Sequence, residues 1–173
     1  MTGSPQPAPF IVTAELPDDM ASWATGLRTE HFPPERNHLK AHVSLFHALP
    51  PSSEGEVKTA LAQEAKDSAP VEAYLEGLMP LGGGTALRLS SPAMIAIWQS
   101  LADRFHGLLI PQDLHKPRLH VTIQNKVTSK EAKALQAELE PYIEPRPFRF
   151  KGLSLHIYRG GPWDFVKTYT FRG

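Results

Sequence analysis

Two four-residue stretches decide how this chain folds: HVSL at residues 42–45 and, 78 residues later, HVTI at residues 120–123. Polar and apolar residues alternate in both, which is the period of a half-buried strand. The imidazole and the hydroxyl two positions later therefore share one face in each stretch. The same shift places a helix predicted over residues 17–31 on one predicted over 92–109, so we interpret the chain as an internal duplication.

The elements predicted around these two tetrads indicate an α+β fold. We expect strands over residues 10–16, 39–45, 71–81, 85–89, 118–123, 148–158 and 163–171, and helices over 17–31, 54–66, 92–109 and from a cap at Ser129 to residue 139. Within residues 148–158 the large apolar side chains change from even-numbered to odd-numbered positions, which predicts a bulge near Gly152. The whole is expected to be a pseudo-symmetric bilobal fold, with two antiparallel-rich sheets facing a central cleft and helices on the outside.

The composition predicts one domain. The chain of 173 residues, 41% of them apolar, is long enough to bury a core without disulfides. We expect residues 10–173 to form a single bilobal domain with interleaved lobes and an internal repeat of roughly 10–81 and 85–158. Residues 1–9 are polar and proline-rich, which predicts a disordered tail. The absence of cysteine excludes thiolate nucleophiles and cysteine-based zinc sites.

The charge balance and the hydropathy of the sequence limit the classes of partner that we expect the chain to bind. The 18 Lys and Arg residues balance 18 Asp and Glu residues, whereas duplex DNA binding relies on a basic surface that displaces counterions. No apolar run approaches the roughly 20 residues that span a bilayer, and the first residues lack the pattern of a secretory signal. We therefore expect a cytoplasmic monomer with neither a membrane nor duplex DNA as partner.

The paired tetrads resemble the defining motif of the two-histidine (2H) phosphoesterase superfamily, which includes the bacterial 2′-5′ RNA ligases that also act as cyclic phosphodiesterases. The likeness covers most of residues 10–172, and residues 153–171 are similar to the family's closing hairpin. It implies an RNA-processing hydrolase that opens a 2′,3′-cyclic phosphate of a nucleotide or an RNA terminus to a monoester, with 2′-5′ ligation as the reverse reaction. It implies no metal and no cofactor. Gln124-Asn125 replaces a basic residue common in the family, which argues against recognition of long RNA.

This chemistry needs two proton carriers, because the attacking water must lose a proton and the departing ribose oxygen must gain one. Imidazole, with an ordinary pKa of about 6.5, can serve as base or acid near neutral pH. The resemblance makes His42 and His120 the catalytic candidates, and near-symmetry leaves their division of roles open. The hydroxyls of Ser44 and Thr122 are predicted to bind the phosphate by donating to its non-bridging oxygens.

Five further residues are candidates for substrate binding. Lys40 and Arg118 share strand parity with the catalytic candidates and could supply positive charge. Tyr158 could stack on a base, as aromatic side chains do with unpaired nucleotides. His47 and His156 could line the cleft.

Two alternatives remain open on the sequence alone. A non-catalytic module that binds nucleotides or RNA ends would keep the fold and the phosphate-binding hydroxyls. A metal hydrolase would draw on His38 and His42, which are four residues apart, and on His47, His106 and His115. Four-residue spacing brings ligands together on a helix, however, and the pattern here is that of a strand.

Overall fold

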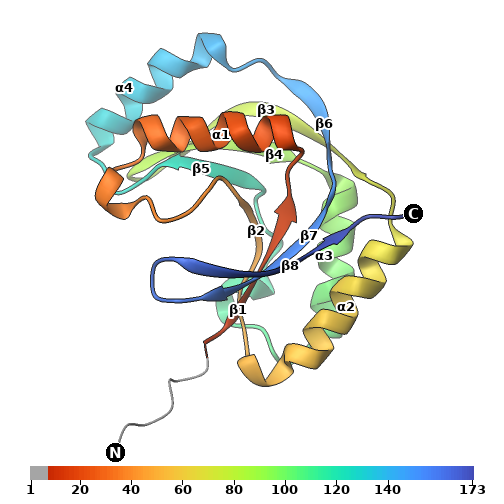
Figure 1. The fold of residues 1–173 in the computed structure, drawn as a ribbon. Coiled ribbons are helices and arrows are strands. Elements are labelled where there is room, and N and C mark those ends of the chain that lie inside the picture. The colour runs from red at the N-terminus through yellow and green to blue at the C-terminus, as the bar shows by residue number, and fades with distance from the viewer. Residues whose placement is uncertain (1–7) are drawn as a thin grey trace, which may run out of the picture.

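Two four-stranded antiparallel sheets form the framework of the computed structural model, which describes residues 8–173 (Figure 1). The first sheet has the order β2 (Val43–Leu49), β1 (Phe10–Glu15), β7 (Gly152–Tyr158) and β8 (Trp163–Thr170). The second has the order β5 (His120–Gln124), β4 (Gly84–Ser90), β3 (Val71–Leu81) and β6 (Arg146–Phe150). The predicted α+β class is confirmed. The predicted internal repeat stays a prediction, and the predicted tail lies mostly outside the described residues.

Four α-helices accompany the sheets: α1 (Asp18–His31), α2 (Glu54–Asp67), α3 (Pro92–Arg104) and α4 (Ser129–Leu139). Helix α1 follows a strand of the first sheet but lies against β5 of the second (Figure 1). Helices α3 and α4 contact the second sheet, while α2 contacts β7, β8 and α3. None of the described helices combines the length and the apolar character that crossing a bilayer requires.

Side-chain hydrogen bonds cap the N-termini of α3 and α4. At the start of α3, the Ser91 hydroxyl accepts a hydrogen bond from the Met94 amide at 3.1 Å. The prediction that Ser129 caps the next helix is wrong, because Thr128 is the cap. Its hydroxyl accepts from the Glu131 amide at 3.1 Å and also bonds the Glu131 carboxylate. A threonine with a glutamate three positions later is the sequence signature of such a helix start.

The segment predicted as one bulged strand over residues 148–158 is two strands in different sheets. β6 ends at Phe150 and pairs with β3, whereas β7 begins at Gly152 and pairs with β1 and β8. The change of parity therefore marks a change of sheet rather than a bulge. Glycine is required at the crossing point, because a Cβ on Gly152 would lie 2.5 Å from the Tyr169 carbonyl oxygen.

The strand predicted over residues 39–45 begins later, at Val43, and continues to Leu49. Residues 39–42 approach it as irregular chain, so His42 lies immediately before β2, while His120 is the first residue of β5. β2 and β5 are edge strands of their sheets and contact each other. The two strands that carry the tetrads therefore lie where the sheets adjoin.

Candidate active site

His42 and His120 have matching hydrogen-bond environments. Nδ1 of His42 lies 2.8 Å from the Lys40 carbonyl oxygen, and Nδ1 of His120 lies 2.6 Å from the Arg118 carbonyl oxygen. A carbonyl oxygen can only accept, so Nδ1 carries the hydrogen in both rings. Neither Nε2 has a hydrogen-bond partner within residues 8–173. Each ring is thus oriented by its own backbone and leaves Nε2 available to a substrate.

The hydroxyls of Ser44 and Thr122 are also available. Both residues are partly exposed, and neither hydroxyl bonds another group in the described part of the chain. By contrast, the buried serine and threonine hydroxyls of residues 8–173 each have a hydrogen-bond partner. These paired residues are Thr13, Ser53, Thr85, Ser91 and Ser154. The two tetrad hydroxyls therefore keep donors that an incoming anion could accept from.

A cavity of about 830 Å³ opens beside His42. Its walls come from α1, β1, residues 38–42 and the hairpin of β7 and β8. The hairpin contributes the rings of His156, Trp163 and Phe165, and the Trp163 ring centroid lies 4.6 Å from that of His42. The histidine ring thus forms part of the cavity wall, with an aromatic surface next to it.

The surroundings of His42 favour its neutral form. Burial lowers the pKa of His42 to about 4. The positive charges of Arg28, His156 and His120 lower it further, in that order, whereas the bond to the Lys40 carbonyl raises it. At neutral pH the ring is therefore uncharged, with its lone pair on Nε2. Burial also lowers the pKa of His156, although the Glu15 carboxylate opposes that shift.

The strand register adds a cation beside His120. Arg88 of β4 is the direct cross-strand partner of His120, and paired side chains in an antiparallel sheet lie on the same face. Arg88 is exposed, so its charge is available to a ligand at that face. In the first sheet, Ser44 pairs with Thr13 of β1 in the same manner.

Of the substrate-binding candidates, the structure brings Lys40 and His156 to the cavity. His156 is held there by a 3.1 Å hydrogen bond between its Nε2 and the Thr13 hydroxyl. Arg118 and Tyr158 do not line the cavity. The Arg118 guanidinium contacts the sulfur of Met79 at 3.8 Å, and Tyr158, which is 43% exposed, pairs with Trp163 near the end of the hairpin.

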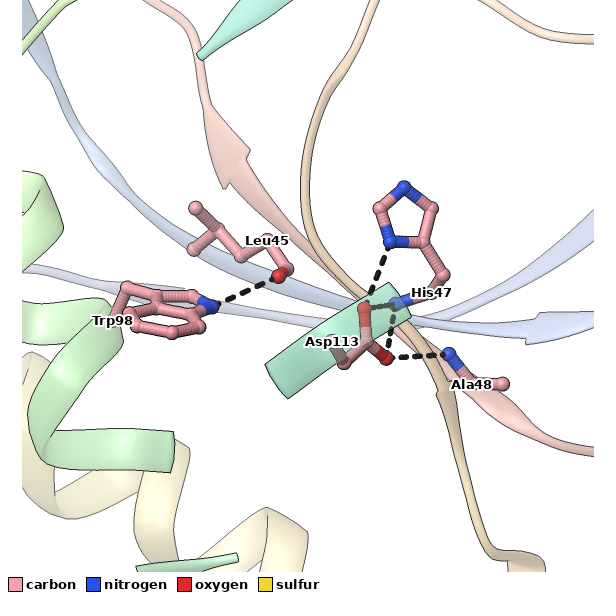
Figure 2. A network of polar contacts seen from close by, with 5 residues as sticks. All are labelled: Leu45, His47, Ala48, Trp98 and Asp113. Carbon is pink, nitrogen blue, oxygen red and sulfur yellow. Dashed lines mark hydrogen bonds and ion pairs between the residues drawn. The ribbon is translucent and has the colours of Figure 1, made fainter. Parts of the chain in front are cut away.

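His47 lies in a separate polar network, shown in Figure 2. Asp113, in the short 3-10 helix Pro111–Leu114, is 2% exposed and accepts from the backbone amides of His47 and Ala48. Its carboxylate also lies 2.8 Å from Nδ1 of His47. The network ties the 3-10 helix to β2, and His47 does not line the cavity.

We expect Asp113→Ala to lower the free energy of unfolding by about 1–3 kcal/mol, because the amides of His47 and Ala48 lose their buried acceptor. Thermal denaturation followed by circular dichroism measures the loss. Asp113→Asn keeps one carbonyl oxygen and should lose less than Asp113→Ala. An unchanged melting temperature in Asp113→Ala would contradict a structural role for this network.

Arg28 is the residue at this site that nothing in the sequence marks. It lies in the last turn of α1, where a cation ordinarily interacts with the helix dipole. The structure instead buries it to 3% exposure and directs a guanidinium nitrogen to the Thr122 carbonyl oxygen at 2.8 Å. For Thr13 and Glu15, which also line the cavity, the alternation along residues 10–16 does place both on the face opposite the apolar side chains.

The histidines considered as metal ligands do not assemble into a site. Within residues 8–173, no group of three or more His, Asp or Glu side chains is placed to hold a metal ion. His38 and His42 both line the cavity, but His47 binds Asp113 elsewhere. The geometry therefore gives the metal hydrolase alternative no support.

The two-sheet fold with one histidine tetrad in each half defines a protein of the 2H phosphoesterase type, and solved structures share the fold. Escherichia coli LigT complexed with 3′-AMP has a TM-score of 0.65 and 13% identity over 97% of this chain and 100% of that chain. TT0787 of Thermus thermophilus has a TM-score of 0.64 and 14% identity over 95% and 98%. A structure described as a phosphoesterase has a TM-score of 0.64 and 15% identity over 97% and 100%.

Residues 16–162 match the family model of the 2′-5′ RNA ligase superfamily, so the chain belongs to that superfamily. The resemblance seen in the tetrads is thereby confirmed. No curated protein sequence matches the chain.

Proposed function

We propose that this protein is a metal-independent phosphodiesterase that opens a 2′,3′-cyclic phosphate, on a nucleotide or an RNA end, to a monoester. One observation carries the proposal: both tetrad histidines donate Nδ1–H to the carbonyl two residues earlier and keep Nε2 free. Two imidazoles with the same hydrogen-bond environment, at the beginnings of edge strands that contact each other, suit a reaction that takes one proton from water and gives another to a leaving oxygen.

The burial of the His42 ring, which keeps it neutral, favours His42 rather than His120 as the base. His42 is neutral at pH 7, because burial lowers its pKa to about 4. Its Nε2 accepts a proton from water as the water oxygen attacks phosphorus. The bond from phosphorus to one ribose oxygen breaks, and protonated His120 donates its Nε2 proton to that oxygen. The product is a ribose monophosphate with one free hydroxyl.

The phosphate would be held by the unpaired donors of the tetrads. The hydroxyls of Ser44 and Thr122 donate to the non-bridging oxygens, whose charge must be stabilised as the bonds rearrange. Arg88 beside His120 and Lys40 beside His42 add positive charge from the two sides. Because the strand backbone already positions both hydroxyl side chains, they need to reorganise little during the reaction.

The nucleoside would occupy the cavity next to His42. Its volume of about 830 Å³ is within the range of small-molecule sites. Trp163 and Phe165 offer aromatic faces on which a base can stack. The LigT structures complexed with 3′-AMP, ATP and NADP⁺ support small nucleotides as ligands in relatives of the same fold.

The deciding experiment incubates the purified protein with 2′,3′-cyclic mononucleotides, with and without EDTA, and follows monoester formation by chromatography. Turnover that is indifferent to EDTA supports the proposal. Turnover abolished by EDTA and restored by a divalent cation would favour a metal hydrolase. Tight nucleotide binding without turnover would favour a non-catalytic module.

The pH dependence of kcat/KM should be bell-shaped, with the acid limb displaced toward low pH. Protonation of the base stops the reaction, and the pKa of His42 is lowered to about 4, so activity should persist below the ordinary histidine range and fall only as the pH approaches 4. Initial rates in buffers of constant ionic strength measure the profile. An acid limb at about 6.5 would contradict the assignment of His42 as base.

A further inference from the structure

The Arg28 side chain forms hydrogen bonds both to the segment that precedes the first tetrad and to the second tetrad. Its guanidinium Nε lies 3.1 Å from the Leu39 carbonyl oxygen, and Nη2 lies 3.2 Å from Oδ1 of Asn37. Its Nη1 lies 2.8 Å from the Thr122 carbonyl oxygen. Leu39 and Asn37 belong to the segment that leads into His42, while Thr122 is part of the second tetrad. One planar group thus spans the junction between the sheets.

This guanidinium is a buried cation without a carboxylate. Arg28 is 3% exposed, and no Asp or Glu of residues 8–173 forms an ion pair with it. Burial lowers the pKa of Arg28 to about 10, so it still carries its charge at neutral pH. The Phe32 ring, with its centroid 4.2 Å from the guanidinium carbon, supplies a cation–π contact in place of an anion. Burying an unpaired charge is costly, which makes a purely structural role a poor explanation.

We propose that Arg28 is a positioning residue that fixes the spacing of His42 and His120 and, through its unbalanced charge, keeps His42 in its neutral form. The inference rests on the proposed function. Arg28 is too buried to bind substrate itself, so it acts through the backbone of the two tetrads.

Other charged groups also face His42 and must be weighed. The positive charges of His156 and His120 act on its ring together with that of Arg28. The remaining titratable residues of the cavity wall are Glu15, Asp18, His38 and Lys40. Of these, Glu15 acts on His156 and Asp18 pairs with Lys151. Lys40 also lies beside the ring, but the charges that lower the pKa of His42 are those of Arg28, His156 and His120, of which Arg28 has the largest effect.

The first test separates geometry from charge. Arg28→Lys keeps the charge but cannot reach all three oxygen acceptors, whereas Arg28→Met removes both. For a 2′,3′-cyclic mononucleotide we expect kcat to fall on the order of 10²-fold in both variants, with KM within a few-fold of wild type, because sub-ångström placement of the proton carriers is disturbed. NMR titration of the His42 ring should give a higher pKa in Arg28→Met and little change in Arg28→Lys.

A milder variant keeps the proposal testable if Arg28→Met fails to fold. Asn37→Asp preserves the shape and the acceptor but gives the guanidinium a counter-charge. We expect it to raise the pKa of His42 in the same NMR titration and to leave the thermal stability near that of wild type.

Ser91→Ala is the matched control, because the buried Ser91 hydroxyl caps α3 and bonds the Glu72 carbonyl and the Met94 amide, neither of which belongs to a tetrad. It should lower the melting temperature without changing kcat or the pKa of His42. Wild-type kcat in Arg28→Lys, or an unchanged His42 titration in Asn37→Asp, would overturn the proposal. Failure of the proposed function would be visible separately, as absence of turnover in the wild type, and the NMR titration would still test the coupling of Arg28 to His42.

Discussion

Replacing either His42 or His120 with alanine is expected to lower kcat for a 2′,3′-cyclic mononucleotide by about 10²–10⁴-fold, the usual contribution of one general acid or base. Each ring is partly exposed and bonds only its own backbone, so its removal should leave the fold intact. Steady-state kinetics measure the loss, and circular dichroism checks the fold. The double variant should be only modestly slower than the single ones, because the two proton transfers belong to one step.

His47→Ala is the matched control for these variants. His47 is an imidazole of the same strand as the first tetrad, but its Nδ1 binds Asp113 outside the cavity. Its loss should reduce stability slightly and leave kcat near that of wild type. Wild-type turnover in His42→Ala or His120→Ala, or a collapse of kcat in His47→Ala, would show that the wrong imidazoles have been assigned.

The largest effect on stability is expected from Phe46→Ala, which should lower the free energy of unfolding by about 3–5 kcal/mol. Phe46 has no exposed surface and lies between two aromatic rings of the second half of the chain. Its ring centroid is 5.9 Å from that of Trp98, in a stacked arrangement, and 5.5 Å from that of Phe105, edge to face. At about 2–4 °C per kcal/mol for a chain of this size, the melting temperature should fall by roughly 6–20 °C.

Phe165→Ala is the corresponding control, since the same side chain is 63% exposed there. Its removal should leave the melting temperature almost unchanged and raise KM, because Phe165 lines the cavity proposed for the nucleoside. Equal thermal destabilisation of the two variants would contradict this placement of the core.

The alternation around the two tetrads was sufficient to predict the fold class and most of its elements. Val43 and Leu45 are buried and Ser44 is not, as the period of two requires. The same reasoning failed over residues 148–158, because a change of parity looks identical in the sequence whether the strand bulges or the chain passes to another sheet. Which neighbour a strand pairs with is decided by tertiary contacts that local periodicity does not encode.

Less of the candidate site could be predicted. The tetrad motif identified two histidines and two hydroxyl residues as candidates. The matching hydrogen bonds of the two Nδ1 atoms, however, depend on the backbone geometry just before each strand. The difference between the two histidines depends on the hairpin of β7 and β8, far along the chain from His42, which brings Trp163 against one ring. Arg28 was indistinguishable from an ordinary surface arginine, because burial of a helix terminus by the opposite sheet leaves no trace in a local pattern.

The passage from β6 to β7 limits how the molecule can move. Only Lys151 separates Phe150, buried in one sheet, from Gly152, pressed against the backbone in the other. The Lys151 amide donates to the Glu15 carbonyl, and its own carbonyl accepts from Phe171. So short and so fully bonded a connection restricts hinge motion between the two sheets at this crossing. A ligand is therefore expected to enter the cavity that opens beside His42 while the two sheets keep their relative positions.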